Sequence, residues 1–151
     1  MRITIDTDST TDGAPSNLQI GYFFFRIFAG VNLFLHGFMR MITGVSAWVA
    51  PQTETFVDTY LPMPLVSLVL HMIPYIEVFI GTFMILGLLT RWALIGGLAF
   101  MFVLLYGHLT RQNWSGAHIV MHYGIYYWLL IVLIGQNWLA LDNRRASAPD
   151  G

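Results

Sequence analysis

Four long apolar stretches constrain the fold of this chain more than any other feature of its sequence. A helix of roughly 20 residues is needed to cross the hydrocarbon core of a membrane, which is about 30 Å thick. Apolar stretches of that length occupy residues 18–43, 64–90, 92–110 and 117–140. Inside lipid every backbone polar group must be paired within the protein, and these stretches lack the alternation of a barrel strand. The sequence therefore predicts an all-α fold, a four-helix transmembrane bundle.

The connections between these stretches predict the packing order and the domain limits. Residues 44–63 mix apolar and acidic side chains, so we expect an interfacial helical segment after the first span. The link around Arg91 is so short that the second and third spans must form an antiparallel hairpin. Pro74, inside the second span, predicts a kink. The predicted regions are a polar N-terminal tail (1–17), one membrane domain (18–142) and a C-terminal tail (143–151).

Composition excludes several classes of function. Charged residues make up only 10% of the chain, against about 25% in a soluble domain. The formal net charge is -1, and a chain without a strongly basic surface is not expected to bind nucleic acid. Cysteine is absent, which removes disulfides, thiolate metal sites and thiol catalysis together. The sequence shows no nucleotide fingerprint or nucleophilic triad, so we assign no catalytic residue and expect no stand-alone enzyme.

Arginines predict the orientation of the chain in the membrane. Both termini and the hairpin link lie on one side, because the four spans alternate in direction. That side carries Arg2, Arg91, Arg144 and Arg145, whereas the opposite side carries Arg40 and Arg111. Positively charged residues are enriched on the cytoplasmic side of membrane proteins. We therefore expect a multi-pass protein with both termini in the cytoplasm.

All five histidines are expected at the same depth of the membrane. His36 falls late in the first span, His71 early in the second and His108 at the end of the third. His118 and His122 come at the start of the fourth span, so alternating span direction brings all five to the side away from the termini. Ionisable groups within a membrane are costly and commonly mark a functional site. On the predicted orientation, this histidine layer lies in the outer leaflet.

Polar residues on the helix faces predict a common interior. Arg26 and Arg40 share a stripe of the first span, and His118 and His122 would point into the same interior from the fourth. We expect Glu77, near the middle of the second span, to face this interior and to have a polar partner. The candidate partners are Arg26 and Asn32. Asn32 is the nearer one, because helix side chains lean toward their N-termini and this separates Arg26 from Glu77.

Each of these features also has a purely structural explanation. A single histidine within a membrane can serve only to hydrogen-bond a neighbouring helix, and His118 can lie at the water interface. A pair between Arg26 and Glu77 can serve only to fix the helix arrangement. Arg40 and Arg111 flank their spans, where long cationic side chains commonly extend to lipid phosphates.

Short motifs follow one another along the chain in a recognisable order. The first span contains RIFAG at 26–30 and LHGFMR at 35–40. The second contains PYIE at 74–77 and LGLLTR at 86–91, with Gly81 between them, and the fourth ends in Leu141-Asp142. Over residues 18–142 these motifs and their spacing resemble the DoxX family of small four-helix membrane proteins.

The resemblance implies a four-helix bundle in a prokaryotic inner membrane. It also implies that Arg26, His36, Gly37 and Glu77 are positions shared with the family. Some members are subunits of a thiosulfate:quinone oxidoreductase, and others associate with redox enzymes or oxidative-stress systems. This chain departs from the family pattern in having Arg40 where lysine is common, and in its pair of histidines in the fourth span.

The leading functional prediction is a small integral subunit of a respiratory or other membrane redox complex, beside a quinone or haem b site. An imidazole can hydrogen-bond a quinone carbonyl or ligate haem iron. If iron is bound, His122 is the expected ligand, with His36 or His71 opposite it, whereas His118 and His122 together are candidate ligands of a smaller metal ion. The candidate cofactor-binding residues are His36, His71, His108, His122, Arg40, Glu77 and Arg26.

Two other functions stay open at this point. The chain can be a structural accessory subunit, which contacts membrane lipids and a larger membrane complex and has no cofactor of its own. Its aromatic faces and short loops fit that role equally well. A small transporter is disfavoured, because the four spans show neither an internal repeat nor a second broken helix.

Overall fold

The computed structural model describes residues 14–146, with side chains described as far as residue 143, and all regular structure in this part is helical. The four long helices are α1 (Asn17–Thr43), α3 (Met63–Leu86), α4 (Thr90–Thr110) and α5 (Trp114–Val132). The three short ones are α2 (Val45–Glu54), the 3-10 helix η1 (Ile134–Gln136) and α6 (Leu141–Ala146). The predicted all-α class is confirmed for the described residues. Most of the predicted N-terminal tail lies outside them.

Three of the long helices, α1, α3 and α4, have the length and apolar composition needed to cross a membrane. The fourth, α5, is not among them. It has 19 residues, which include two histidines and three tyrosines. The structure thus supports a multi-pass membrane protein, while α5 as a fourth span stays a prediction.

A capping box determines where α1 begins, and a glycine determines where α3 ends. The hydroxyl of Ser16 accepts a hydrogen bond from the N–H of Gln19 at 3.2 Å, and Gln19 Oε1 accepts one from the N–H of Ser16 at 2.9 Å. This reciprocal capping box satisfies two N–H groups that the helix itself leaves unpaired. At the other end, α3 stops at Gly87, which adopts a left-handed conformation with φ of 65°. α3 therefore ends at Leu86, four residues before the end that the sequence predicted for the second span, residue 90.

α1 and α3 form one closely packed antiparallel pair, and glycines permit the contact. A Cβ at Gly37 would lie 2.8 Å from the Cβ of Glu77, and a Cβ at Gly81 would lie 2.6 Å from the backbone nitrogen of Phe34. Neither distance is compatible with a larger residue unless a helix moves. Within a membrane, small residues let helix backbones approach one another, and association then depends on this packing.

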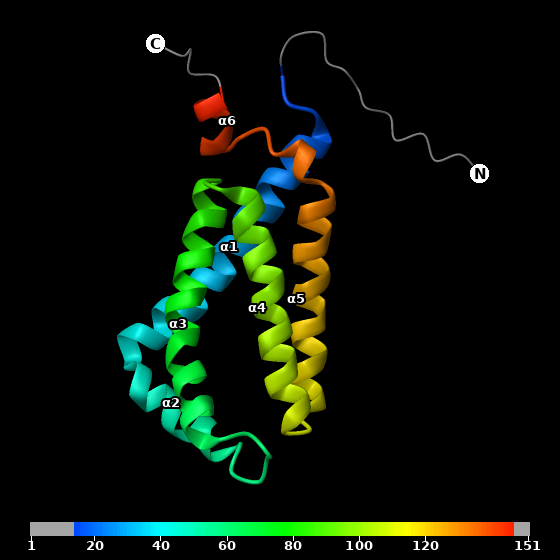
Figure 1. Cartoon of the computed structure of the whole chain (residues 1–151). Helices are drawn as coiled ribbons and strands as arrows, with labels where there is room; N and C mark the ends of the chain where they lie inside the picture. The colour runs from blue at the N-terminus through cyan, green and yellow to red at the C-terminus, as the bar shows by residue number, and fades with distance from the viewer. Residues whose placement is uncertain (1–13, 147–151) are drawn as a thin grey trace, which may run out of the picture.

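α4 and α5 form a second antiparallel pair of the same kind. The ring of Tyr127 on α5 lies against Gly97 of α4, and the ring of His108 on α4 lies against Gly116 of α5. Figure 1 shows the two pairs joined through the short turn between α3 and α4 and further apart at the opposite end, where α2 runs beside α3. The four long helices are thus two pairs that meet most closely near the described termini.

The C-terminal segment holds the turn between α3 and α4. The carboxylate of Asp142 accepts hydrogen bonds from the N–H groups of Leu89 at 2.7 Å and Thr90 at 2.8 Å, which caps α4. The N–H of Asp142 donates to the carbonyl oxygen of Gly87 at 3.0 Å. The sequence predicted a fourth span to residue 140, but α5 ends at Val132 because the chain turns there to reach this position. Helix α6 also extends into the predicted C-terminal tail.

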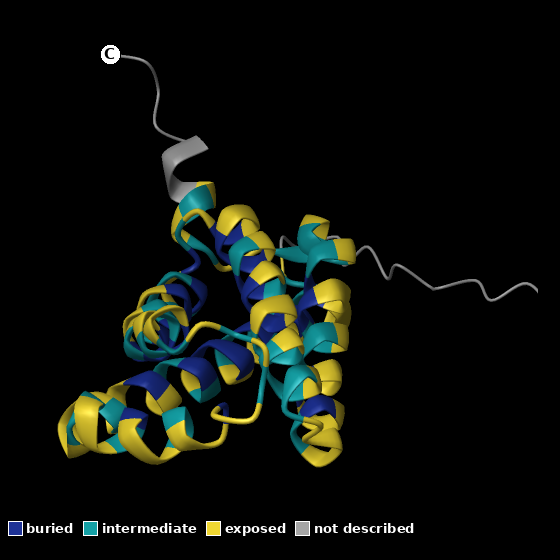
Figure 2. Cartoon of the chain, turned by 60° about the horizontal axis from the view of Figure 1, so that its bottom comes forward, coloured by how far each residue is buried: buried dark blue, intermediate teal, exposed yellow. Residues whose placement is uncertain are grey.

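Burial divides the surface as expected for a protein in lipid. In Figure 2 the buried residues lie along the faces on which helices meet, and exposed residues cover the outward faces. Large apolar side chains are among the most exposed, such as Phe28 at 67% and Phe79 at 63%. An apolar outer surface is favourable in lipid, because an exposed phenylalanine there contacts acyl chains and not water.

Candidate functional site

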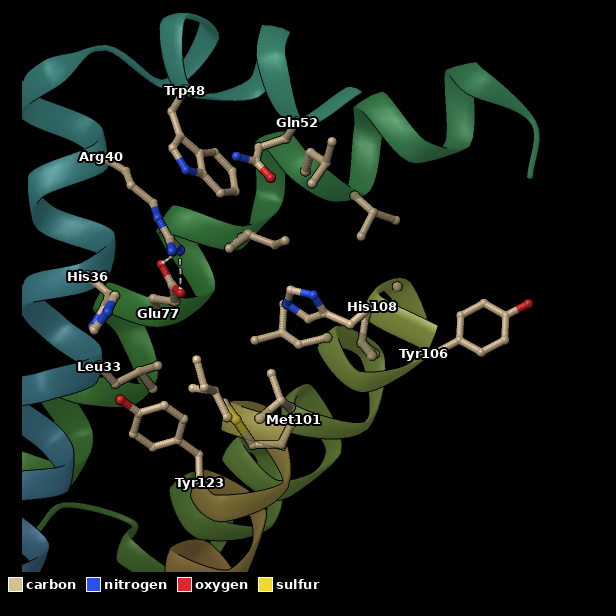
Figure 3. Close-up of a pocket in the computed structure, with 18 of the residues that line it drawn as sticks. Leu33, His36, Arg40, Trp48, Gln52, Glu77, Met101, Tyr106, His108 and Tyr123 are labelled. Atoms are coloured by element: carbon tan, nitrogen blue, oxygen red, sulfur yellow. Dashed lines mark hydrogen bonds and ion pairs between the residues drawn. The ribbon is translucent and has the colours of Figure 1, made fainter. Parts of the chain in front are cut away.

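A cavity of about 400 Å³ lies between the two helix pairs, at the end away from the described termini. Its walls come from the four long helices, and α2 with the loop after it closes one side (Figure 3). Apolar side chains form most of the lining. The polar lining residues are Asn32, His36, Arg40, Gln52, Glu77, Tyr106, His108, Arg111, Tyr123, Tyr126 and Tyr127. Apolar cavities of roughly 300–1,000 Å³ with a few converging polar groups are typical of small-molecule sites.

Arg40 and Glu77 form an ion pair on the wall of this cavity (Figure 3). Glu77 is 3% exposed, and both of its carboxylate oxygens lie 2.5 Å from Nη1 of Arg40. The guanidinium also lies over the ring of Trp48 in α2, 4.4 Å from its centroid. The prediction that Glu77 faces the interior with a polar partner is confirmed, but that partner is neither Arg26 nor Asn32.

Helix geometry explains why Glu77 pairs with Arg40. Each Cα–Cβ bond leans toward the N-terminus of its own helix. Arg40 therefore leans back along α1 toward Gly37, while Glu77 leans along the antiparallel α3 toward the cavity end. The missing side chain at Gly37 lets the backbone of Glu77 lie directly against α1. Arg40 thus binds within the protein, in contrast to the predicted extension of its side chain to lipid phosphates.

Arg26 lies at the opposite end of the same helix pair and does not line the cavity. It is 1% exposed, and its Nη1 donates to the carbonyl oxygens of Met84 and, at 3.2 Å, Ile85. Its Nη2 donates to the carbonyl oxygen of Leu139 at 2.6 Å. A cation at this position binds carbonyl oxygens in the last turn of α3, where the helix dipole is negative. The proposed pairing of Arg26 with Glu77 is therefore wrong, and Arg26 instead joins α1, α3 and the C-terminal segment.

His36 and His108 line the cavity from different helix pairs, and their neighbours fix opposite tautomers. Nδ1 of His36 must donate to the carbonyl oxygen of Asn32 at 2.8 Å, because a carbonyl only accepts. Neutral His36 therefore presents Nε2 as an acceptor. Nδ1 of His108 must accept from Nη2 of Arg111 at 3.0 Å, because a guanidinium only donates. Neutral His108 therefore carries its proton on Nε2 and offers a donor.

Arg111 connects the end of α4 to the segment around α2. Its Nη1 donates to Thr55 Oγ1 at 2.8 Å and to Gln52 Oε1 at 3.3 Å. Its guanidinium lies over the ring of Phe56 at 5.2 Å from the centroid. Burial lowers the pKa of Arg111, but arginine ordinarily titrates above about 12 and so stays charged at neutral pH. Arg40 and Arg111 therefore both contribute a cation to the lining of the cavity.

The other three histidines do not line the cavity. His71 is partly exposed on α3, and its Nδ1 donates to the carbonyl oxygen of Ser67 at 2.7 Å. His118 and His122 are both exposed on the outward side of α5. Among the described residues, no three histidine, aspartate or glutamate side chains gather closely enough to hold a metal ion.

The predicted inward orientation of His118 and His122 is wrong. The inner face of α5 is occupied by its buried residues Ala117, Val120, Tyr127 and Leu130. His122 therefore points away from His36 and does not form an axial pair with it across the interior. The role of His118 and His122 as ligands of a smaller ion stays a prediction.

Three residues that contribute to the cavity were not predicted from the sequence. Trp48 and Gln52 come from α2, which was predicted only as an interfacial segment. Tyr127 is 2% exposed, and its buried hydroxyl has no hydrogen-bond partner among the described residues. A signal for Tyr127 was available, because Gly97 in the preceding span leaves room for one large ring on a facing helix.

Comparison with known proteins identifies the family. The sequence model of the DoxX family matches residues 21–109, more than half of the 151 residues. The chain belongs to the DoxX family. The match to DoxX covers Arg26, His36, Arg40 and Glu77 but ends within α4, so α5 lies beyond it. No curated protein and no solved structure gives a significant match. This DoxX protein is thus a multi-pass membrane protein that contacts lipid.

Proposed function

We propose that this DoxX protein is a small subunit of a respiratory or other redox complex, and that its cavity holds the head group of a membrane quinone. The observation that carries the proposal is the pair of histidines with opposite tautomers, His36 and His108, on the lining of one apolar cavity. Quinones are apolar rings with polar oxygens, and apolar sites with a few oriented polar groups suit such molecules.

The two histidines match the two redox forms of a quinone. A quinone carbonyl is an acceptor, and Nε2–H of His108 is a donor. A quinol hydroxyl can donate, and Nε2 of His36 is an acceptor. A subunit that exchanges quinone for quinol needs partners for both forms. Haem is less well supported, because the expected ligand His122 lies on the outer surface of α5.

Tyr127 and Arg40 supply further polar contacts at the same cavity. Within residues 14–146 the buried hydroxyl of Tyr127 has no hydrogen-bond partner, and such a group costs free energy unless a ligand or water satisfies it. Arg40 uses Nη1 for Glu77, and its side chain is still 24% exposed. Both groups are therefore positioned to hydrogen-bond the oxygen substituents of a quinone ring.

We further infer that α5 is the fourth membrane span and that both termini are cytoplasmic. α5 runs antiparallel to α4 and returns the chain to the end from which α1 starts (Figure 1). The arginines Arg2, Arg91, Arg144 and Arg145 are assigned to that end by the sequence, which favours the cytoplasmic side. In a prokaryotic inner membrane, the cavity would then open in the outer leaflet.

Direct measurement of quinone binding tests the proposal. The protein is extracted in native lipid discs, and the quinone retained per chain is compared with that in the surrounding membrane. Affinity for a short-chain quinone is then measured in detergent. The wild type should retain about one quinone per chain, and His36→Ala should weaken affinity by about tenfold through the loss of one hydrogen bond. Leu104→Trp, which fills the cavity, should abolish binding.

A matched control is His71→Ala. His71 also donates its Nδ1 proton to a carbonyl one turn earlier, but it lies outside the cavity. This variant should bind quinone as the wild type does. Equal affinity in the wild type and Leu104→Trp would contradict the quinone site and leave the accessory-subunit function. A Soret band in the purified protein would instead establish haem.

A further inference from the structure

Three potential metal donors lie together on the outer face of α5, away from the cavity. His118 and His122 are exposed and one helical turn apart, with their ring centroids separated by 4.5 Å. Met121 lies three residues after His118 and is 55% exposed. Residues three and four apart on a helix are neighbours on its surface. Two imidazoles and one thioether therefore share one patch.

The hydrogen bonding of His122 prepares it to bind a metal ion. Its Nδ1 lies 2.8 Å from the carbonyl oxygen of His118 and must donate to it, because the carbonyl only accepts. The lone pair of neutral His122 is therefore on Nε2. Metal-bound histidines usually donate their other ring N–H to a carbonyl or carboxylate, which fixes the tautomer and the ring orientation. The backbone of His118 already provides this support.

The patch is also close enough to the membrane surface for an aqueous ion to reach it. α5 begins at Trp114. With a helical rise of about 1.5 Å per residue, His118 lies roughly 6 Å along the helix from that start and His122 roughly 12 Å. The polar headgroup region is about 5–8 Å deep on each side of the hydrocarbon core. With Trp114 at the membrane surface, His118 lies near the boundary between headgroups and hydrocarbon, and His122 lies about one helical turn deeper.

We propose that His118, Met121 and His122 form a binding site for a single copper ion on the outer face of α5. Imidazole binds copper well in either oxidation state, and a thioether favours Cu(I) over harder ions. Three donors on one helix face leave a coordination position open. This inference does not depend on a quinone in the cavity, because the site shares no residue with the cavity lining.

The test measures Cu(I) affinity of the purified full-length chain in detergent. The protein carries an affinity tag without histidine, and a chromogenic Cu(I) chelator competes for the ion under anaerobic, reducing conditions. We expect one Cu(I) per wild-type chain. His118→Ala and His122→Ala should each weaken the affinity at least about tenfold, because even residues that only support a ligand contribute that much. Met121→Leu should weaken Cu(I) binding and leave Zn(II) affinity unchanged.

His71→Ala is the matched control for this site. His71 has the same hydrogen bond from Nδ1 to a carbonyl one turn earlier, but no second histidine lies one turn away. Its substitution should leave copper affinity unchanged. Melting temperatures should be similar for all four variants, because the residues are wholly or partly exposed. Absent Cu(I) binding in the wild type, or a Cu(I) affinity in His118→Ala and His122→Ala that equals that of the wild type, would overturn the proposal.

Discussion

Nη1 of Arg40 lies 2.5 Å from both carboxylate oxygens of Glu77, and this contact joins α1 to α3 at the cavity. The two partners are unequally buried, with side chains 24% and 4% exposed. Removing one partner of a buried pair commonly costs about 3–5 kcal/mol, because it leaves a buried charge uncompensated. We expect Arg40→Leu to lower the free energy of unfolding by about 3 kcal/mol, and Glu77→Leu to lower it less, because Arg40 can turn toward water.

Denaturant unfolding in detergent, followed by circular dichroism, measures these differences. The double variant Arg40→Leu/Glu77→Leu should recover much of the stability lost in Arg40→Leu, since no charge is then left buried. Additive losses in the double variant would show that the two side chains act independently.

Gly37 should be the most sensitive small residue in the contact between α1 and α3. An added Cβ would lie 2.8 Å from the Cβ of Glu77, so Gly37→Ala must separate the helices or displace the acid. We expect a loss of about 1–3 kcal/mol, the usual cost of overpacking. Gly21→Ala is the control in the same helix, because no atom of the described residues lies within 4 Å of its Cβ position. That control should be neutral or stabilising, since alanine is the better helix former. Equal losses in the two variants would contradict the close contact.

Asp142→Ala should weaken the start of α4. The carboxylate accepts from the N–H groups of Leu89 and Thr90, and loss of a capping side chain costs about 0.5–2 kcal/mol. Hydrogen exchange should become faster at these two amides and remain unchanged in the middle of α4. Asp58→Ala, in the exposed loop after α2, provides a control with the same change in charge. Unaltered protection of Leu89 and Thr90 would show that Asp142 does not cap this helix.

Tyr127→Phe separates ligand binding from stability. The buried hydroxyl has no hydrogen-bond partner in the described part of the chain, so its removal should leave the free energy of unfolding unchanged or increased in the absence of ligand. If a ligand in the cavity accepts a hydrogen bond from this hydroxyl, the same variant should weaken binding of that ligand by several-fold. Thermal unfolding with and without a short-chain quinone measures both effects. A destabilised variant without ligand would reveal that the hydroxyl has a partner within the protein.

The helices and much of the cavity end were predictable from the sequence. Lipid offers no partner for backbone polar groups, so a long apolar stretch has few alternatives to a helix. Helix length and alternating direction then place His36 and His108 at one end of the molecule. These two histidines do line the cavity, together with Arg40 and Glu77. The sequence thus determined which elements form and at which depth their polar residues lie.

The rotation of each helix about its own axis was decided only by tertiary packing. In water, an apolar face identifies the inside of a helix, but in lipid every face can be apolar. α5 turns Tyr127 inward because Gly97 of α4 accommodates its ring, and this places His118 and His122 on the outside. Glu77 pairs with Arg40 for a similar reason, since Gly37 fixes how α1 and α3 meet. Contacts between helices, which hydropathy does not record, therefore decided which polar residues form the site.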